Sequence, residues 1–181
     1  MTATPPPSDG SALCTSCGLC CDGALFNRAV SKPGEIGRLT SFGLEAITVG
    51  DKVRFPLPCA MLDGASCTIY EHRFDICRSF KCKLLNRYLG GEIGLETALQ
   101  TVANAKKQIA AVAALDPSAA IMRGRTDLYK AEKDWTEIED PEARRAKGKL
   151  MFSVTVLDRY LDTHFRRRPD AKTAGQAGEV E

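Results

Sequence analysis

The residues that could do chemistry in this 181-residue chain are its eight cysteines, all of which lie at or before position 82. Thiolates are soft ligands that select zinc, copper(I) or iron–sulfur clusters. Two-residue gaps let one tight turn aim successive sulfurs at a single ion or cluster. We therefore interpret the cysteines as metal ligands. Four lie in the segment CTSCGLCC and four follow at wider spacing: Cys14, Cys17, Cys20, Cys21, Cys59, Cys67, Cys77 and Cys82.

Two other interpretations of the cysteines are weaker. The first four also fit one face of a helix, where they would be small buried apolar side chains, but the glycine after Cys17 and the number of thiols in one half argue against this. A disulfide framework would need an oxidising compartment. The N-terminal stretch MTATPPPSDGSA lacks the basic and apolar regions of an export signal. We therefore expect a reduced, cytoplasmic protein whose thiols bind metal.

The spacing leaves the identity of the metal open. Zinc sites with four cysteines usually take paired cysteines from separate knuckles, whereas iron–sulfur clusters often take a run of closely spaced cysteines. The segment CTSCGLCC resembles such a run, but it lacks the proline and the three-residue gap of the ferredoxin pattern. The expected cofactor is zinc or iron, with an iron–sulfur cluster as one form of the latter.

Composition restricts the possible partners. Hydrophobic residues make up 44% of the chain and charged residues 27%, as in an ordinary globular protein. The net charge of +2 is too small to indicate nucleic acid or an anionic membrane as a partner. No apolar run reaches the ~18 residues that suggest a membrane span. The last helix is rich in lysine and arginine, which leaves a protein partner open, with RNA as a weaker alternative.

The predicted fold class is α+β and rich in helix: a small cysteine-cluster domain stapled by metal, followed by a helical extension. We assign residues 1–12 to a disordered leader and residues 13–90 to the metal-binding domain. Residues 91–168 form the helical extension that packs on it. Residues 169–181, small and polar, form a disordered tail.

Local signals predict a short helix after the first cysteines. Ser31 is a candidate cap, and Pro33 suits the first turn. Leu39 and Phe42 would then face inward, and Gly43 would end the helix.

Further along, the pattern predicts a hairpin over Val49–Phe55 and a short strand over Cys67–Tyr70. Arg73–Cys77 is expected to make one helical turn. Lys81–Leu89 is expected to form a helix that ends at a glycine pair.

Two long helices are predicted in the second half. The first runs from Leu95 to about Leu115, and Asp116 with its following proline restarts the chain. Its expected apolar face comprises Leu95, Leu99, Val102, Ile109 and Ala113. The last helix runs from about Pro141 to Phe165, with a strand at Ser153–Val156 as a minor alternative. Its expected buried stripe comprises Leu150, Val154, Leu157 and Leu161.

The cysteine pattern resembles the CxxCxxCC family (YkgJ type), described as zinc- or iron-chelating proteins. The family pattern runs CxxCGxCC, a variable stretch, then PC, a turn, C-x-IY, an Arg-Pro pair, CR and C. The chain departs from it at Phe74, where the family usually carries proline. The resemblance covers roughly Cys14 to Leu89 and implies metal binding by all eight cysteines. Residues that match besides the cysteines are Gly18, Pro58, Ile69, Tyr70, Arg73 and Arg78.

Three functions follow from this pattern. The leading one is a protein that binds zinc or iron through its eight thiolates; the second is an iron–sulfur redox enzyme or electron carrier, and the third is an interaction module with a purely structural metal. A catalytic zinc needs an open coordination position, and eight cysteines divide evenly into two closed sites. His72 and His164 are better explained as a solvated group and a structural group. The sequence therefore favours, without settling it, a protein that is not an enzyme.

Two finer predictions concern the ligands. Adjacent side chains point in different directions, so Cys20 and Cys21 are expected to serve two different centres. Cys14 and Cys17 would serve one of them, and the later four cysteines would complete both. Arg73, Arg78 and Lys81 lie next to ligands in the chain and are expected to offset thiolate charge by hydrogen bonds to sulfur.

Overall fold

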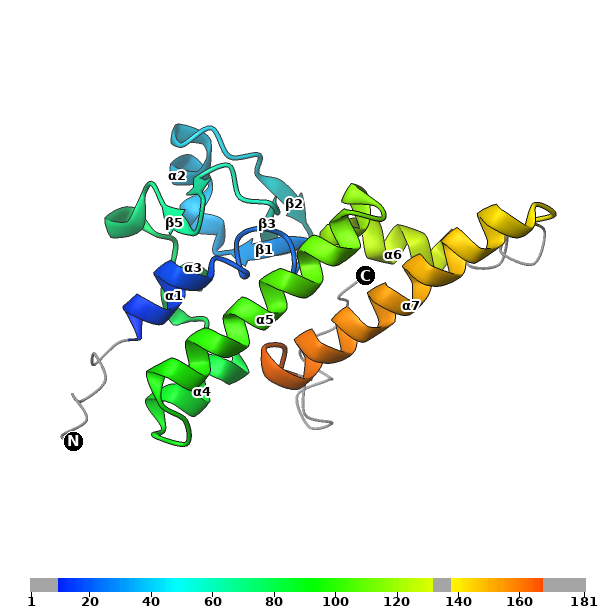
Figure 1. The fold of residues 1–181 in the computed structure, drawn as a ribbon. Helices are drawn as coiled ribbons and strands as arrows, with labels where there is room; N and C mark the ends of the chain where they lie inside the picture. Colours follow the sequence, from blue (N-terminus) through cyan, green and yellow to red (C-terminus); the bar gives the residue numbers. More distant parts are fainter. Residues whose placement is uncertain (1–9, 132–137, 168–181) are drawn as a thin grey trace.

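The computed structural model describes residues 10–131 and 138–167, and its fold is α+β and rich in helix, as predicted (Figure 1). Small antiparallel sheets lie on one side of the molecule and long helices on the other. The predicted tail and most of the predicted leader lie outside the described residues. The described chain begins at Gly10, and helix α1 (Ser11–Cys17) follows directly.

The larger sheet has the strand order β1-β3-β2 and is antiparallel throughout: β1 (Arg28–Ser31), β2 (Ile47–Val49) and β3 (Lys52–Pro56). The β2–β3 pairing, with Val49 opposite Lys52, confirms the predicted hairpin. Strand β1 was not expected, because its four residues carry no alternating pattern. Val53 and Phe55 point inward from β3 and are almost fully buried.

The segment after β1 differs from the prediction at its start. Ser31 ends the strand, is buried, and donates its hydroxyl to Glu35 at 2.6 Å, so it does not cap the helix. A 3-10 turn η1 (Pro33–Glu35) leads into α2 (Ile36–Ser41). Leu39 is fully buried and Gly43 follows the helix with φ 70°, both as predicted.

Short elements carry the later cysteines. Strands β4 (Leu62–Asp63) and β5 (Ser66–Cys67) form a hairpin with a two-residue loop. The strand expected over Cys67–Tyr70 is therefore wrong beyond its first residue. Tyr70 instead opens a 3-10 turn, because the chain bends where the hairpin ends. The remaining elements here are η2 (Tyr70–His72), α3 (Asp75–Ser79) and α4 (Lys83–Leu89).

The second half is helical: α5 (Leu95–Ala113), η3 (Pro117–Ala120), α6 (Met122–Lys130) and α7 (Pro141–His164). All four residues of the predicted α7 stripe are buried, and Ser153–Val156 is helical rather than a strand. The predicted face of α5 is wrong in part, since Leu99 is 37% exposed. Small residues occupy the inner face instead, which lets neighbouring helices approach closely. The buried residues of α5 are Ala98, Val102, Ala105 and Val112.

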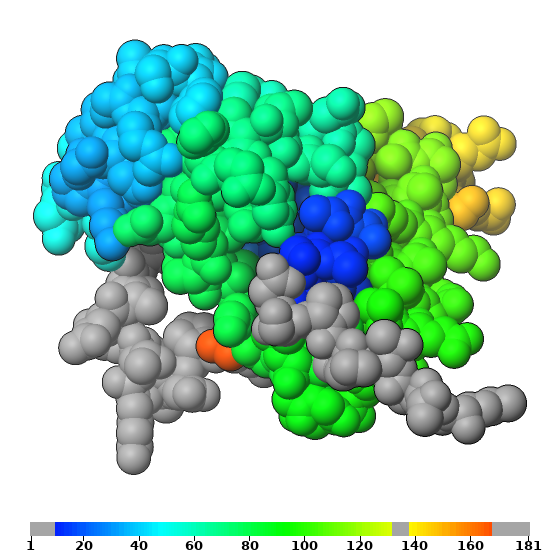
Figure 2. Space-filling model, turned by 90° about the vertical axis from the view of Figure 1, so that its left-hand side faces the viewer, coloured from blue at the N-terminus to red at the C-terminus, as the bar shows by residue number. Residues whose placement is uncertain are grey.

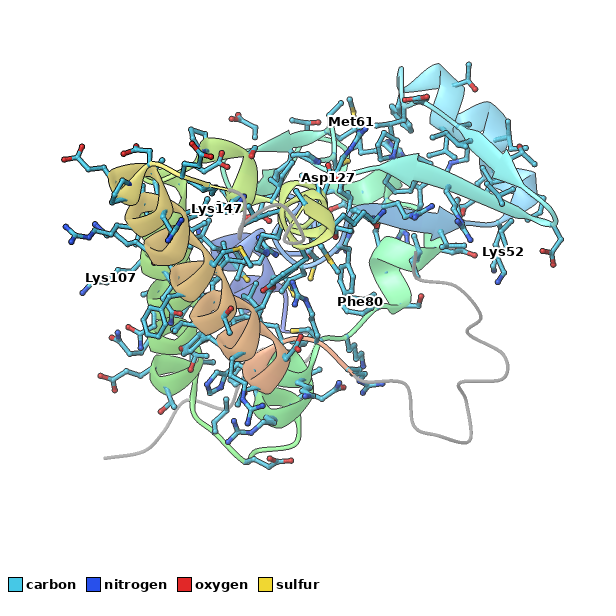
Figure 3. The ribbon with its side chains drawn as sticks, turned by 90° about the vertical axis from the view of Figure 1, so that its right-hand side faces the viewer. Lys52, Met61, Phe80, Lys107, Asp127 and Lys147 are labelled. Carbon is cyan, nitrogen blue, oxygen red and sulfur yellow. The ribbon has the colours of Figure 1, made fainter. Side chains whose placement is uncertain are left out.

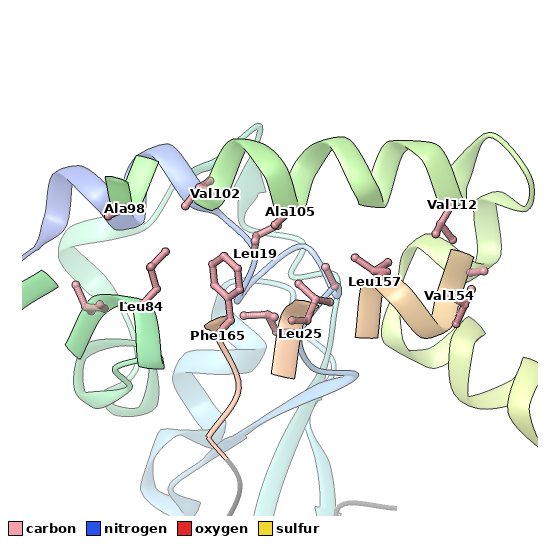
Figure 4. Close-up of a cluster of buried hydrophobic side chains, with 14 of the residues drawn as sticks. Leu19, Leu25, Leu84, Ala98, Val102, Ala105, Val112, Val154, Leu157 and Phe165 are labelled. Carbon is pink, nitrogen blue, oxygen red and sulfur yellow. The ribbon is translucent and has the colours of Figure 1, made fainter. Parts of the chain in front are cut away.

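Two hydrophobic clusters form the core of the described chain. The helical cluster joins α4, α5 and α7 to the segment CTSCGLCC and the residues just after it. Leu19 in that segment and Leu25 after it are fully buried against Leu84 and Phe165 (Figure 4). The sheet cluster comprises Leu39, Leu44, Val53, Phe55, Leu57 and Phe74. The first cysteines are therefore packed into the same core as the C-terminal helices. Within the described residues, no helix has the length and apolar character needed to cross a membrane.

Candidate metal centre

The first four cysteines occupy a helix end and the turn that follows it. Cys14 and Cys17 lie on α1, whereas Cys20 and Cys21 lie in the turn after it. The single tight turn expected for all four cysteines is therefore formed only by the second pair. Gly18 ends the helix with φ 75°, and its N–H donates to the carbonyl of Cys14 at 3.2 Å. The N–H of Cys21 then donates back to the carbonyl of Gly18 at 2.8 Å. These bonds fix the path of the backbone between the two cysteine pairs.

Gly18 also brings the cysteine turn against the β4–β5 hairpin. A Cβ atom at this position would lie 3.0 Å from the Cα of Ala65. Only glycine combines the positive φ with so close an approach. The contact brings the hairpin that carries Cys67 next to the first cysteines.

Each of the later cysteines is placed by a different element. The N–H of Cys59 donates to the carbonyl of Cys21 at 2.8 Å. Cys67 lies opposite Leu62 in the β4–β5 hairpin, and Cys77 lies on α3. Cys82 precedes α4 as its N-terminal cap, with its sulfur accepting from the N–H of Leu85 at 3.4 Å.

All eight cysteines line one cavity of about 370 Å³. None forms a disulfide, and seven are half-buried while Cys14 is exposed. The other walls are mainly apolar and include Phe26, Phe80 and Phe165. In Figure 3, sulfur atoms lie between the helices and the sheet side of the molecule. In Figure 2, blue atoms of the cysteine segment reach the surface with green atoms around them. The structure thus gathers all predicted ligands around one space.

Packing separates the cysteines into two sets. Cys17, Cys20 and Cys82 lie against the helical cluster. Cys59 and Cys77 lie against the sheet cluster. These five cysteines of the cavity are therefore held by two different hydrophobic clusters.

Electrostatic repulsion among the sulfurs follows a similar division with one exception, since Cys21 raises the pKa of Cys20 more than Cys14 does. Burial raises the pKa of Cys17 to about 12, and the negative charge of Cys82 and Cys14 adds to the increase, while the N–H of Leu19 opposes it. Burial also raises the pKa of Cys20 well above its ordinary value, with further increases from Cys82, Cys17, Cys21 and Cys14. We call Cys14, Cys17, Cys20 and Cys82 the first group.

The remaining cysteines influence one another. Burial raises the pKa of Cys21 to about 12, followed by repulsion from Cys77, Cys59 and Cys67. Burial likewise raises the pKa of Cys77 to about 11, followed by repulsion from Cys59 and Cys67. We call Cys21, Cys59, Cys67 and Cys77 the second group. Within residues 10–131 and 138–167, no three His, Cys, Asp or Glu side chains converge closely enough to hold one ion as they stand.

Basic residues lie near both groups. Arg73 lowers the pKa of Cys77 through its charge, although burial raises that pKa overall, and its guanidinium stacks 3.5 Å from the centre of the Tyr70 ring. Arg78 donates to the carbonyls of Arg73 at 2.9 Å and Glu71 at 2.5 Å, which ties α3 to the 3-10 turn before it. Arg167, which the sequence did not single out, lowers the pKa of Cys82 against the larger effect of burial.

Sequence reasoning also missed a buried arginine network behind the cysteine turn. Arg125 is 1% exposed and donates to Asp158 at 3.1 Å and to the carbonyls of Ala120 and Ala24 at 2.8 and 2.5 Å. Arg166 donates to the same Asp158 and to the carbonyl of Leu25. The network ties α6 and α7 to the backbone just after Cys21. The i,i+4 spacing of Asp162 and Arg166, which form an ion pair at 3.0 Å, was an available signal.

Neither histidine lines the cysteine cavity. His72 is exposed, and its carbonyl accepts a hydrogen bond from Arg38. His164 stacks on Tyr160 with ring centres 4.4 Å apart. Burial and the nearby Arg87 and Lys83 lower the pKa of His164. These placements agree with the expectation of a solvated His72 and a structural His164.

The fold and the cavity define a cysteine-cluster domain of the metal-chelating class, set in a helix-rich α+β chain. The chain belongs to the CxxCxxCC family, whose model matches residues 13–109, more than half of the chain, under the description "Putative zinc- or iron-chelating domain". The matched region contains all eight cysteines and extends into α5. No curated protein and no solved structure matched the chain.

Proposed function

We propose that this protein binds two metal centres, one through the first group of cysteines and one through the second. The observation that carries the proposal is that all eight sulfurs line one cavity, while Cys17, Cys20 and Cys82 pack against the helical cluster and Cys59 and Cys77 against the sheet cluster. Cys20 and Cys21 fall into different groups although they are adjacent in the chain. Adjacent side chains point in different directions, so this split is the one that the backbone permits most easily.

The chemistry of the thiols fits metal binding coupled to proton release. Burial keeps Cys17, Cys20 and Cys21 protonated near neutral pH, because it raises the pKa of each of these thiols. A metal ion binds the thiolate, so each centre must displace protons as it forms. We propose that the sulfurs move inward when a metal ion binds. Since thiols must stay reduced for this role, we place the protein in the cytoplasm.

Charge balance gives the basic residues a role. Two divalent ions with eight thiolates carry a net charge of about −4. We propose that Arg73, Arg78 and Lys81 offset part of this charge, together with Arg167 beside Cys82. Arg73 and Arg167 act on sulfur through their charge. Arg78 acts through the backbone that it holds next to Cys77.

The same proposal assigns roles along the chain. Residues 13–90 form the metal-binding domain, and residues 91–168 form a helical extension that completes its core. Two closed four-thiolate sites leave no open position for substrate, so we propose chelation rather than catalysis. The first turns of α7 are exposed and basic, which suits a protein partner of acidic character.

A second candidate function is electron transfer by iron–sulfur clusters. The size of the cavity favours it. A water molecule takes up about 30 Å³ in the liquid, and a bare metal ion is smaller still, whereas the cavity measures about 370 Å³. A cluster of several iron and sulfide ions would use more of this space than two single ions.

Anaerobic purification followed by elemental analysis and visible spectroscopy tests both candidates. We expect about two zinc or iron centres per chain. A colourless protein with two zinc ions would support chelation, and a brown protein with stoichiometric sulfide would support the iron–sulfur candidate. A chain that holds one metal ion, or none after anaerobic purification and reconstitution, would contradict the two-centre proposal.

A further inference from the structure

Two arginines are neighbours on the face of the larger sheet opposite Val53 and Phe55. Along β3, Val53 and Phe55 point into the core, so Arg54 between them points to the opposite face. Val30 of β1 lies opposite Arg54, and Arg28 lies two residues before Val30 on the same face. Arg28 and Arg54 are therefore diagonal neighbours, a relationship that places residues about 7–8 Å apart.

No described acidic residue offsets this pair of charges. Among residues 10–131 and 138–167, neither arginine takes part in an ion pair. Among the described residues, Arg28 donates only to the side-chain oxygen of Asn27, at 3.3 Å. The Nε atom of Arg54 is buried and has no hydrogen-bond partner in the described chain. Burying such a donor without a partner is unfavourable, so the sheet holds a donor without an acceptor next to a second positive charge.

Both arginines line the cavity that contains the cysteines. Its described walls include three arginines, Arg28, Arg54 and Arg73, and no aspartate or glutamate. Most of the other lining side chains are apolar or sulfur. Small-molecule sites typically combine apolar walls with a few polar groups that orient the ligand.

We propose that Arg28 and Arg54 bind an oxyanion group, a phosphate or a carboxylate, of a small molecule that enters the cysteine cavity. Arginine presents several donors in a planar fork that matches the two oxygens of such a group. An anion between the two side chains would satisfy the buried Nε of Arg54 and relieve the repulsion between neighbouring positive charges. The proposal does not depend on which metal the cysteines hold.

A small ligand fits this position better than a nucleic acid. The unmet donor of Arg54 is buried at the wall of a cavity, whereas a polymer backbone binds exposed basic surfaces. Balancing the thiolates is the other role open to these arginines. Other cations already lie close to the sulfurs, since Arg73 is near Cys77 and Arg167 is near Cys82.

Calorimetric titration of the full-length, metal-loaded protein with inorganic phosphate, and separately with succinate, tests the proposal. We expect at least one of the two probes to bind. The variants Arg54→Ala and Arg28→Ala should each weaken that binding by about tenfold or more without changing the metal content. Lys52→Ala is the matched control, because Lys52 is on the same face of β3 at the outer end of the sheet and does not line the cavity (Figure 3). The stronger probe identifies the group as phosphate or carboxylate.

Arg54→Lys keeps the positive charge and removes the two-pronged donor. It should retain the metal and still bind the probe several-fold more weakly than the wild type. Failure of both probes to bind the wild type would overturn the proposal, as would undiminished binding in both alanine variants. Loss of metal in Arg54→Ala, with binding and metal both normal in Arg54→Lys, would assign Arg54 to charge balance instead.

Discussion

The N–H of Cys59 donates a hydrogen bond of 2.8 Å to the carbonyl oxygen of Cys21. These residues are far apart in the chain, and this bond fixes the second cysteine segment directly against the end of the first. The bond uses only backbone atoms, so it places the two residues side by side without engaging either sulfur. It therefore defines the starting geometry of the second group of cysteines.

The division of the cysteines predicts how pairs of mutations combine. Cys20→Ser and Cys21→Ser should each lose about one of two metal centres, because each removes a ligand from a different group. Cys20→Ser with Cys82→Ser should lose no more than Cys20→Ser alone, whereas Cys20→Ser with Cys77→Ser should lose both centres. Metal content of the purified variants is the measurement. Loss of both centres in the Cys20–Cys82 double variant would contradict the division.

Gly18 is predicted to tolerate alanine less well than Gly43. Both follow a helix with positive φ, 75° and 70°, so both substitutions carry a backbone cost of about 1–2 kcal/mol. Only Gly18 also faces Ala65, since a Cβ at Gly43 would meet nothing within 4 Å. Urea unfolding should show a larger loss of stability for Gly18→Ala, together with weaker metal retention. Equal losses in the two variants would show that the contact with the hairpin contributes nothing.

Removing Asp158 is predicted to destabilise the protein strongly. Asp158 pairs with Arg125, whose side chain is 1% exposed, so Asp158→Ala leaves a buried guanidinium without its counter-charge. Breaking a buried pair in this way costs about 3–5 kcal/mol. Asp162→Ala is the control, because Asp162 is 37% exposed and pairs only with Arg166 among described residues, and its loss should cost about 0–1 kcal/mol. Similar free energies of unfolding for the two variants would refute this role of Arg125.

Glu35 is predicted to contribute to the decline of stability in acid. Burial disfavours its carboxylate, but the Ser31 hydroxyl and the N–H groups of Asp75 and Lys32 stabilise it and hold the pKa of Glu35 below its ordinary value. The unfolded chain thus takes up the proton first. The stabilisation is complete above the ordinary value, about pH 4.3 for glutamate, and is lost as the pH falls through the lower folded-state pKa.

Glu35→Gln should therefore be less stable than the wild type near neutral pH and should lose less stability on acidification. Urea unfolding at pH 7, 5, 4 and 3 measures both effects. Glu45→Gln is the control, since Glu45 is exposed, and its stability should follow that of the wild type across the series. Parallel curves for Glu35→Gln and the wild type would rule out the contribution of Glu35.

Several features of the fold could be read from local sequence. The glycine at position 43 ends a helix because its backbone adopts positive φ without strain. The α7 stripe was predicted correctly because four large aliphatic residues recur with the period of a helix. The inner face of α5 was misjudged because alanines occupy it, and alanine gives little periodic signal on its own. Ser31 was misassigned because its partner, Glu35, is buried by packing that the local sequence does not contain.

The sequence by itself determined a cluster of eight cysteines whose residue type and short spacing indicate metal binding, and the family match supports that chemistry. It also determined that Cys20 and Cys21 should separate, since neighbouring side chains point apart. Only the tertiary structure decided which later cysteines pack against which hydrophobic cluster. Cys82 caps the N-terminus of α4, whose Leu84 packs into the helical cluster. Cys59 and Cys77 pack against the sheet cluster. Burial of apolar side chains far from the sulfurs makes that choice, because it sets where each segment comes to rest.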